Sequence, residues 1–242
     1  MHIFRIYTPQ ILNLNKIIIL SDQSTHYLKN VLRITIKNLI ILFNNENQEF
    51  LGKIIKFYNN MTYIFLIKKL CNNTESPLKI HLGQVICNRK SMEYIIQKSV
   101  ELGVFQITPL LSEYCYKKIK FSQLKIKIER WKKMIIFASQ QCGRKYLLQI
   151  NQPLSIIEWC EKKNDILKIY TDPKAKNRIN DIYGHHSKIR LLIGPEGGLS
   201  KKEQEYIIKN NFYTIKIGPR ILRVETSALC AITLLQTFFG DF

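Results

Sequence analysis

The 242-residue chain has no long hydrophobic run. Its apolar stretches, such as KIIIL at 16–20, are far shorter than the roughly 18–20 residues that a membrane helix requires. The first residues, MHIFRIYTPQ, lack the charged segment, apolar core and small-residue cleavage site of a secretory signal. These absences argue against a membrane-spanning or exported protein, and we expect a cytoplasmic one.

Paired cysteines and clustered metal ligands are missing as well. No two cysteines form a CxxC pair, and the six are widely scattered, at Cys71, Cys87, Cys115, Cys142, Cys160 and Cys230. This spacing argues against a disulfide framework or a zinc site, and it predicts reduced, mostly buried thiols. No set of His, Cys, Asp and Glu has metal-ligand spacing, so we expect no metal.

Acidic residues are scarce. The chain has 18 Asp and Glu against 37 Lys and Arg, which gives a formal net charge of +19 and a pI near 9.7. Such a surface attracts polyanions, and nucleic-acid phosphates are the usual partner. An AT-rich genome is the alternative source of the lysines, because Ile and Asn are abundant too. Net charge alone does not distinguish RNA from DNA.

What the chain does contain is first a β-rich segment. Residues 1–71 hold the runs HIFRI, KIIIL, LIILF, FLGKIIKFY and TYIFLIKKL, separated by polar turn clusters. One helix is expected over 21–32, with Ser21 or Asp22 as its N-cap. Its apolar face consists of Tyr27, Leu28, Val31 and Leu32. The pattern predicts a small barrel or sandwich, followed by a linker at 72–77.

From residue 78 to residue 242, strands and helices alternate. Strands are expected at 79–87, 105–110, 166–172, 189–194 and 213–218. Helices are expected at 90–103, 121–143 and 154–163, and from Ser200 and about Glu225 onward. This alternation predicts an α/β domain whose mostly parallel sheet is covered by helices on both faces.

Two strands of this second domain end in glycine-containing loops. The first loop follows LLI in LLIGPEGGLSKKE, where Gly197 and Gly198 would allow a ligand to approach the backbone. Ser200 and Glu203 form an S-x-x-E capping box that begins the next helix. An ordinary glycine turn is the alternative for this loop by itself. Neither GxxxxGK[ST] nor GxGxxG is present, so a nucleotide triphosphatase or dinucleotide enzyme is poorly supported.

The second loop lies in IKIGPRILRVETSALCAITLLQ, residues 215–236. Thr226 or Ser227 can cap the apolar helix that follows, and Glu225 would lie near its positive end. Arg220 and Arg223 flank the turn; they are either solvated or hold a phosphate or carboxylate.

The pair GPEGGLSKKE and IGPRILRVETS resembles the signature of the RsmE family of 16S rRNA uridine N3-methyltransferases, which belong to the SPOUT class. Upstream, MEYIIQKSVELGVFQITPLLSE and FASQQCGR resemble further parts of that family, and HYLKNVLRITIKN resembles its PUA-like start. The sequence departs from the family pattern at Gln140, at Ser227 and over 145–150. Two long motifs in this order are much stronger evidence than either alone.

The resemblance implies a trefoil knot in the second domain, in which both loops hold S-adenosylmethionine in a bent shape. The cofactor residues that it implies are Thr171, Leu192, Ile193, Gly194, Pro195, Glu196, Gly197, Gly198, Ile217, Gly218, Ile221, Leu222, Arg223, Glu225, Thr226 and Ala228. Among them, isoleucines and Leu222 would pack around the adenine.

It also implies methylation of one uridine on N3, at position 1498 in conventional rRNA numbering, by a homodimer acting on the small ribosomal subunit. Glu225 is the candidate base and Arg223 the candidate stabiliser of the uracil anion, a helix-end charge and a ligand clamp being their alternatives. Ala228 and Ala231 in the last helix would pack against the partner subunit. The candidate RNA contacts are Arg5, Lys29, Arg33, Arg144 and Arg220.

Two rival functions stay open at the level of sequence. One is a related SPOUT enzyme that methylates tRNA or a ribose 2′-OH, against which the barrel and the particular pair of loops argue. The other is a noncatalytic RNA-binding protein on the same scaffold, against which the retention of both glycine loops argues.

Overall fold

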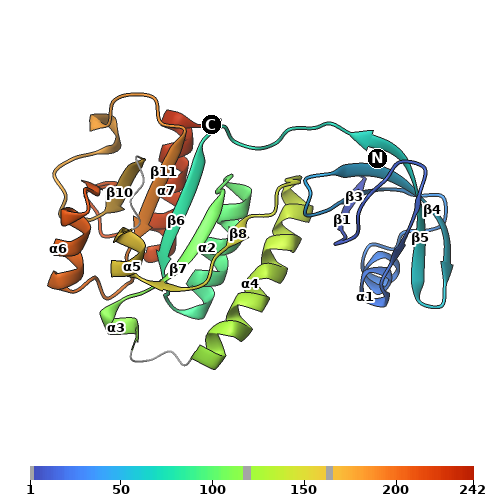
Figure 1. Ribbon diagram of the computed structural model, residues 1–242, viewed down its shortest axis with the longest axis horizontal. Coiled ribbons are helices and arrows are strands. Elements are labelled where there is room, and N and C mark those ends of the chain that lie inside the picture. The colour runs from blue at the N-terminus through green and yellow to red at the C-terminus, as the bar shows by residue number, and fades with distance from the viewer. Residues whose placement is uncertain (1–2, 117–120, 162–165) are drawn as a thin grey trace. The chain divides into compact units, whose positions relative to one another are not determined.

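The computed structural model describes residues 3–116, 121–161 and 166–242 (Figure 1). The chain divides into two compact units. The first comprises Met1–Glu75 together with Ser139–Leu147, and the second comprises Ser76–Ala138 and Leu148–Phe242. The segment 139–147 therefore belongs to the first unit by its contacts, although it lies in the middle of the sequence assigned to the second domain. The predicted domain ranges themselves stay predictions.

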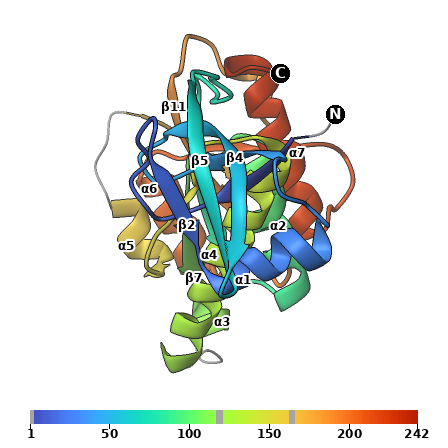
Figure 2. The ribbon, with the colours of Figure 1, turned by 90° about the vertical axis from the view of Figure 1, so that its right-hand side faces the viewer.

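The first unit is built on a five-stranded mixed sheet (Figure 2). Its strands are β1 (Phe4–Tyr7), β2 (Ile17–Leu20), β3 (Leu39–Phe43), β4 (Glu49–Tyr58) and β5 (Met61–Leu70), in the order β1-β3-β4-β5-β2. Only β1 and β3 run parallel; the other neighbours are antiparallel. All five predicted strands are confirmed, although His2, in the first predicted run, lies outside the described residues.

Alternation along these strands produces a one-sided core. On β5, Ile64 and Leu66 are fully buried, whereas Phe65 between them is exposed. Ile54 of β4 and Ile18 of β2 join Ile64 in one apolar cluster. Side chains on a strand point alternately to opposite faces, so one face of this sheet forms the core and the other meets solvent.

The predicted helix of the first unit consists of two parts. α1 (Asp22–His26) has Ser21 at its N-cap position, and a π-helical turn, η1 (Tyr27–Val31), follows directly. Leu28 is buried as predicted, but the prediction for Val31 was wrong, since 60% of it is exposed. The amide of Leu32 bonds five residues back to Tyr27, so the period differs from 3.6 and Val31 rotates off the apolar face.

The second unit contains a sheet in which every pairing is parallel. Its strands are β6 (Lys79–Val85), β7 (Gln106–Leu111), β8 (Gln149–Ile150), β9 (Leu154–Ser155), β10 (Leu167–Thr171), β11 (Lys188–Ile193) and β12 (Tyr213–Ile215). The order is β12-β10-β11-β6-β7-β8, and β9 also pairs with β7. The predicted α/β class and parallel sheet are confirmed. The last strand ends at Ile215, earlier than the predicted residue 218.

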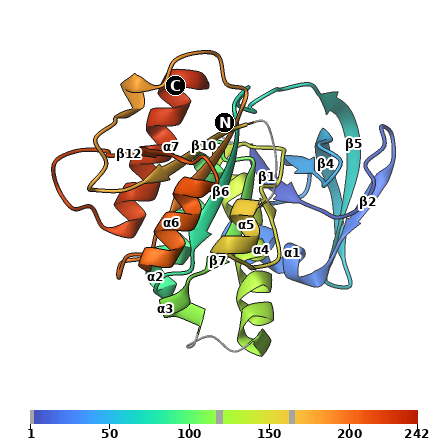
Figure 3. The same cartoon turned by 60° about the vertical axis from the view of Figure 1, so that its left-hand side comes forward.

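Helices cover both faces of this sheet (Figures 2 and 3). The helices are α2 (Arg89–Glu101), α3 (Glu113–Tyr116), α4 (Phe121–Cys142), α5 (Ile156–Glu161), α6 (Lys201–Lys209) and α7 (Val224–Phe239), with a short 3-10 turn, η2 (Ile179–Asp181). α2 packs with α7 and α5 with α6. The predicted helix over 154–163 begins only at Ile156, because Leu154 and Ser155 form β9, and Lys162 and Lys163 lie outside the described residues.

Two glycines are tied to the placement of these helices, and the first, Gly103, ends α2 as the sequence predicted. Gly103 follows the end of α2 with φ +77, a conformation that glycine adopts without strain. On the α5 face, the ring of Trp159 lies so close to Gly83 of β6 that no side chain fits there. Trp159 joins Val85, Leu192 and other apolar residues in a core between the sheet and α5 and α6.

Candidate active site

The carboxyl ends of three neighbouring strands meet at one edge of the parallel sheet. Thr171, the last residue of β10, pairs with Ile215, the last residue of β12. On the other side of β10, Tyr170 pairs with Leu192, one residue before the end of β11. The loops that follow these strands must therefore leave the sheet at the same edge, where ligands of open α/β sheets bind.

A pocket lies where the loops after β10 and β12 meet the start of α7. Its lining residues are Thr171, Asp172, Pro173, Ile215, Ile217, Gly218, Arg220, Leu222 and Ser227. Four of the predicted cofactor residues thus come together here, and Arg220, predicted as an RNA contact, joins them. Apolar walls with a few hydroxyl, carboxylate and guanidinium groups are typical of a small-molecule site.

Backbone hydrogen bonds fix the loops around this pocket. The amide of Asp172 donates to the carbonyl of Ile215 at 2.9 Å, and the amide of Lys216 donates to the carbonyl of Asn177 at 2.9 Å. The Asp172 carboxylate also accepts from the amide of Lys174 at 2.9 Å. The loop after β10 is therefore attached to β12 at two points, and the pocket's walls are held in place before any ligand binds.

The GPEGG loop forms the tight turn that its sequence indicates. Gly198 has φ +74, and its amide donates to the carbonyl of Pro195 at 3.1 Å. Glu196 accepts a hydrogen bond at 2.8 Å from the side-chain amide of Asn88, the N-cap residue of α2. This contact holds the outer part of the loop to a second strand–helix junction, at the carboxyl end of β6.

The capping box after this loop is confirmed. The amide of Glu203 donates to the hydroxyl of Ser200 at 3.2 Å, and the amide of Ser200 donates to the Glu203 carboxylate at 2.9 Å. Glu203 is buried, and its carboxylate also accepts from the amide of Glu113 at 2.8 Å. α6 therefore starts at a fixed position directly after the GPEGG loop.

Two glycines leave space that the chain itself does not fill. A Cβ atom added to Gly197 or Gly218 would have no neighbouring atom within 4 Å, and neither residue has a positive φ. Glycine is therefore not required at these positions by the fold of this chain. The space beside them suits a ligand that lies against bare backbone, and the site fits the cofactor predicted from the sequence in this respect.

The start of α7 differs from the prediction. Arg223 occupies the N-cap position without a side-chain cap, so the expectation that Thr226 or Ser227 caps the helix was wrong. Both lie inside the first turn because the helix already begins at the buried Val224. Ser227 instead donates from its hydroxyl toward that of Thr171 at 3.5 Å. Glu225 lies in the first turn, where a helix favours negative charge, as predicted.

The remaining predicted cofactor residues are not among the residues that line this pocket. Leu192 and Ile193 are buried in β11, and Ala228 is buried in α7. Ile221 is 89% exposed and does not line the pocket. Gly194 and Pro195 are half-buried, whereas Glu196, Arg223 and Thr226 are exposed.

Sequence reasoning missed Asp172, Pro173, Ile215 and Ser227 as lining residues. Asp172 and Pro173 directly follow the apolar strand at 167–171, and a polar residue at the carboxyl end of a parallel strand is the signal that could have identified them. Ala228 and Ala231 were predicted to pack against a partner chain. Both are buried within this chain, so that part of the prediction was wrong.

Two predicted RNA contacts are buried ion pairs of the first unit. Arg144 donates to the carboxylate of Glu75 at 2.7 Å and is 3% exposed. Arg5 pairs with the buried Glu49, lies over the ring of Phe43, and its pKa is lowered by burial. Arg5 also donates to the carbonyl of Arg144 at 3.2 Å. Arg5 thus links segment 139–147 to β1 of the N-terminal sheet, and Arg144 links it to Glu75, beyond the end of β5.

The other predicted RNA contacts are accessible. Lys29 lies with its ammonium 4.7 Å from the centre of the Phe57 ring, and Arg33 is exposed with φ +52. Arg220 is exposed at the rim of the pocket. Of the five predicted RNA contacts, Lys29, Arg33 and Arg220 are therefore accessible to phosphates, whereas Arg5 and Arg144 are not.

Three wider predictions can be compared with the described residues. Among the described residues, no helix is long and apolar enough to cross a membrane. No group of three or more His, Cys, Asp or Glu among them could hold a metal ion. Of the five cysteines that the structure describes, only Cys160 is buried, so the expectation of mostly buried thiols was wrong. Cys71 is exposed, and Cys87, Cys142 and Cys230 are half-buried.

Comparison with known proteins agrees with this geometry. Residues 74–236 match a model of the RNA methyltransferase domain, and residues 20–56 match a model of the RNA methyltransferase PUA domain. The chain is 45% identical to the ribosomal RNA small subunit methyltransferase E of Buchnera aphidicola subsp. Schizaphis graminum, over 98% of this chain and 97% of the relative. The corresponding protein of Buchnera aphidicola subsp. Acyrthosiphon pisum is 43% identical, over 98% and 94%.

Solved structures give the same result. A methyltransferase of Legionella pneumophila, in complex with S-adenosylmethionine, superimposes with a TM-score of 0.95 and 34% identity, over 100% of both chains. The ribosomal RNA small subunit methyltransferase E of Neisseria gonorrhoeae, bound to S-adenosyl methionine, has a TM-score of 0.92 and 30% identity, also over 100% of both. The chain belongs to the ribosomal RNA small subunit methyltransferase E family, the RsmE family that its two loop motifs predicted.

Proposed function

We propose that this protein transfers the methyl group of S-adenosylmethionine to N3 of one uridine in 16S rRNA of the small ribosomal subunit. The observation that carries the proposal is the pocket at the carboxyl ends of β10 and β12, in a chain of this family. The two family members solved with S-adenosylmethionine support the choice of cofactor. The position within the rRNA, 1498, rests on the sequence resemblance.

The residues present fit the cofactor. Gly197 and Gly218 leave free space along bare backbone, while Ile217 and Leu222 provide apolar surface for a flat ring. The cofactor supplies a methyl group on a sulfonium, whose displacement needs alignment more than acid catalysis. The chain's part is therefore to hold two reactants in line, which a pocket with hydrogen-bonded walls does well.

Uracil N3 carries a proton that must leave before the nitrogen can accept a methyl group. We assign its removal to Glu225, which lies half-buried in the first turn of α7, two residues before the pocket-lining Ser227. Arg223, exposed at the N-cap, would stabilise the uracil anion by charge. Arg220 at the pocket rim is placed to hold a phosphate of the RNA.

The proposal includes the partners expected from the family resemblance. The substrate is the small subunit or its 16S rRNA, which places the activity in the cytoplasm, and the enzyme acts as a homodimer. The first domain, 1–71, would bind RNA and the second, 78–242, would bind the cofactor. Since Ala228 and Ala231 are covered by their own chain, the half-buried residues of α7, including Leu229 and Thr233, are the ones that would meet a partner.

The experiment combines cofactor binding and product analysis. Labelled S-adenosylmethionine is incubated with small subunits that lack the modification, and the nucleosides are identified by mass spectrometry. Gly218→Leu should fold normally, since a Cβ atom at this position has no protein atom within 4 Å, and its side chain should occupy the pocket that Gly218 lines. We expect the affinity of this variant for S-adenosylmethionine, measured by calorimetry, to be more than about 100-fold lower than that of the wild type.

Lys216→Leu is the matched control, because it adds the same side chain two residues away, outside the lining of the pocket. It should bind the cofactor like the wild type. Methyl on N3 of one 16S uridine, lost in Gly218→Leu, supports the proposal. Methyl on a ribose or on tRNA would refute the assigned substrate, and RNA binding without any cofactor binding would favour a noncatalytic RNA-binding protein.

A further inference from the structure

A pocket in the first unit combines apolar walls with two cations. It lies between β1, the loop after η1 and the start of β3, and its lining includes Ile3, Phe4, Leu32, Arg33, Lys37 and Leu39. Arg33 and Lys37 are exposed, and neither takes part in a salt bridge among the described residues. No acidic residue lines the pocket.

Hydrogen bonds fix the loop that carries both cations. The amide of Lys37 donates to the carbonyl of Ile54 in β4 at 2.9 Å, and the amide of Ile54 donates to the carbonyl of Asn38 at 3.0 Å. The side-chain oxygen of Asn38 accepts from the amide of Thr35 at 2.8 Å. Arg33 and Lys37 both have positive φ, at 52° and 73°. The loop is thus held in one conformation against the sheet.

Leu39 lines the pocket and is also exposed at the start of β3. Strand pairing places Leu39 opposite Lys53, Lys53 opposite Phe65, and Phe65 opposite Ile17. Directly paired residues of antiparallel strands point to the same face, so these four side chains form one row across β3, β4, β5 and β2. All four are exposed, with Leu39 at 41%, Phe65 at 38% and Ile17 at 53%.

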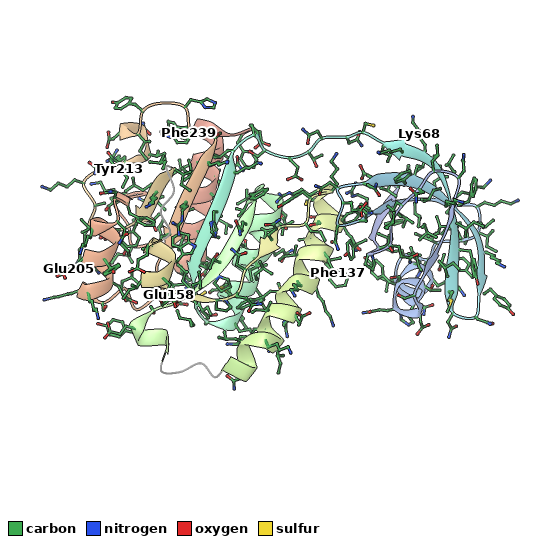
Figure 4. All side chains as sticks on the ribbon, in the orientation of Figure 1. Lys68, Phe137, Glu158, Glu205, Tyr213 and Phe239 are labelled. Carbon is green, nitrogen blue, oxygen red and sulfur yellow. The ribbon has the colours of Figure 1, made fainter. Side chains whose placement is uncertain are left out.

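The neighbouring row repeats this chemistry. Ile19 is paired with Tyr63, and Tyr63 with Lys56, whose ammonium lies 4.5 Å from the centre of the tyrosine ring. Further along β5, Lys68, labelled in Figure 4, is exposed as well. We call the pocket and the first row together the outer surface, defined by Arg33, Lys37, Leu39, Lys53, Phe65 and Ile17.

We propose that the outer surface binds an unpaired segment of the RNA substrate. Aromatic and aliphatic side chains give bases a surface on which to stack, and interleaved lysine and arginine side chains neutralise phosphates, which is how proteins hold single-stranded RNA. Lys53, in the middle of the row, takes part in none of the salt bridges among the described residues, so its charge is available to a phosphate. The inference rests on the proposed function, since it names the part of the chain that holds the RNA.

The experiment measures binding of a fluorescent oligouridylate, and of a duplex of equal length, at several salt concentrations. Phe65→Leu retains apolar surface but removes the ring, and should weaken single-strand binding about tenfold. Phe65→Tyr retains the ring and should bind like the wild type. Lys53→Gln should lower the slope of log affinity against log salt by about 0.7, the value for one lost phosphate contact on a single strand.

Lys209→Gln is the charge-matched control. It removes one exposed lysine from the end of α6, in the other unit, and should leave binding unchanged. S-adenosylmethionine binding is measured on every variant and should not change. In methyl transfer to small subunits, the outer-surface variants should raise KM for the RNA and leave kcat within about twofold.

The outcomes separate the two proposals. If the wild type transfers no methyl group, the proposed function fails, whereas oligouridylate binding still tests the surface. If the wild type is active but Phe65→Leu and Lys53→Gln bind single strands like Lys209→Gln, the surface inference is wrong. Equal weakening by Phe65→Leu and Phe65→Tyr would contradict stacking, and equal affinity for the duplex would contradict recognition of unpaired RNA.

Discussion

The two sheets of this chain expose their residues in opposite ways. In β5 of the mixed sheet, the buried Ile64 is followed by Phe65 at 38% exposure, so one face is free. In β11 of the parallel sheet, Leu191, Leu192 and Ile193 are all at most 1% exposed, because helices cover both faces. A sheet of the first kind can bind a partner across its face, whereas the second can offer a ligand only the loops at its strand ends.

The largest difference between the sheets should appear on removal of one aromatic side chain from each. Trp159→Ala should lower the free energy of unfolding by about 3–5 kcal/mol, since Trp159 is fully buried between α5 and the parallel sheet. Phe65→Ala should cost less than about 1 kcal/mol because the ring is partly exposed on the outer surface. Urea unfolding followed by far-UV circular dichroism measures both. Equal losses would mean that the outer surface is covered in the folded protein.

A smaller difference in stability is expected between alanine substitutions of two glycines, one in the parallel sheet and one in a loop that follows it. Gly83→Ala should destabilise by about 1–3 kcal/mol, since the added Cβ would lie 2.6 Å from the ring of Trp159. Gly197→Ala should change stability by less than about 0.5 kcal/mol, because nothing surrounds its Cβ position. Thermal unfolding without cofactor compares the two. A large loss in Gly197→Ala would show that the loop needs glycine for its own fold, and would remove an argument for the ligand.

The smallest expected effect is a difference in reactivity between two thiols, and its measurement leaves the sequence unchanged. Burial raises the pKa of Cys160 to about 12, whereas Cys71 is exposed at the end of the N-terminal unit's last strand. Thiolate is the reactive form, and at pH 10 a group with this pKa is only about 1% ionised. Alkylation followed by peptide mass spectrometry should therefore label Cys71 at pH 8 and leave Cys160 unlabelled even at pH 10. Labelling of Cys160 at pH 8 without denaturant would contradict its burial.

Much of the fold was predictable because its signals are local. The alternation of Ile64 and Phe65 gives a strand and its buried face, and the capping box of Ser200 and Glu203 spans only three residues. The GPEGG turn is local as well, since one hydrogen bond from Gly198 to Pro195 closes it. Such features depend only on residues that are close together in the sequence, so they can be predicted without knowledge of the tertiary contacts.

Two of the predictions that failed depend on a local register that the periodicity does not reveal. Val31 became exposed because a single π-helical turn shifted the helix period. Ser227 entered the pocket instead of capping α7, because the helix begins three residues earlier, at Val224. In each case a shift of a few residues moved a side chain to a different face.

By itself, the sequence determined the main strands and helices, the two glycine loops and the family, because each of these depends on residues that are close together along the chain. Only the tertiary structure decided which charges are available. Arg144 is buried against Glu75, 69 residues away, and Arg5 against Glu49, while Arg33 and Lys53 stay exposed. For Arg144 and Arg5, a carboxylate from a distant segment compensates for the hydration that the guanidinium group loses on burial, and that pairing exists only after the chain has folded.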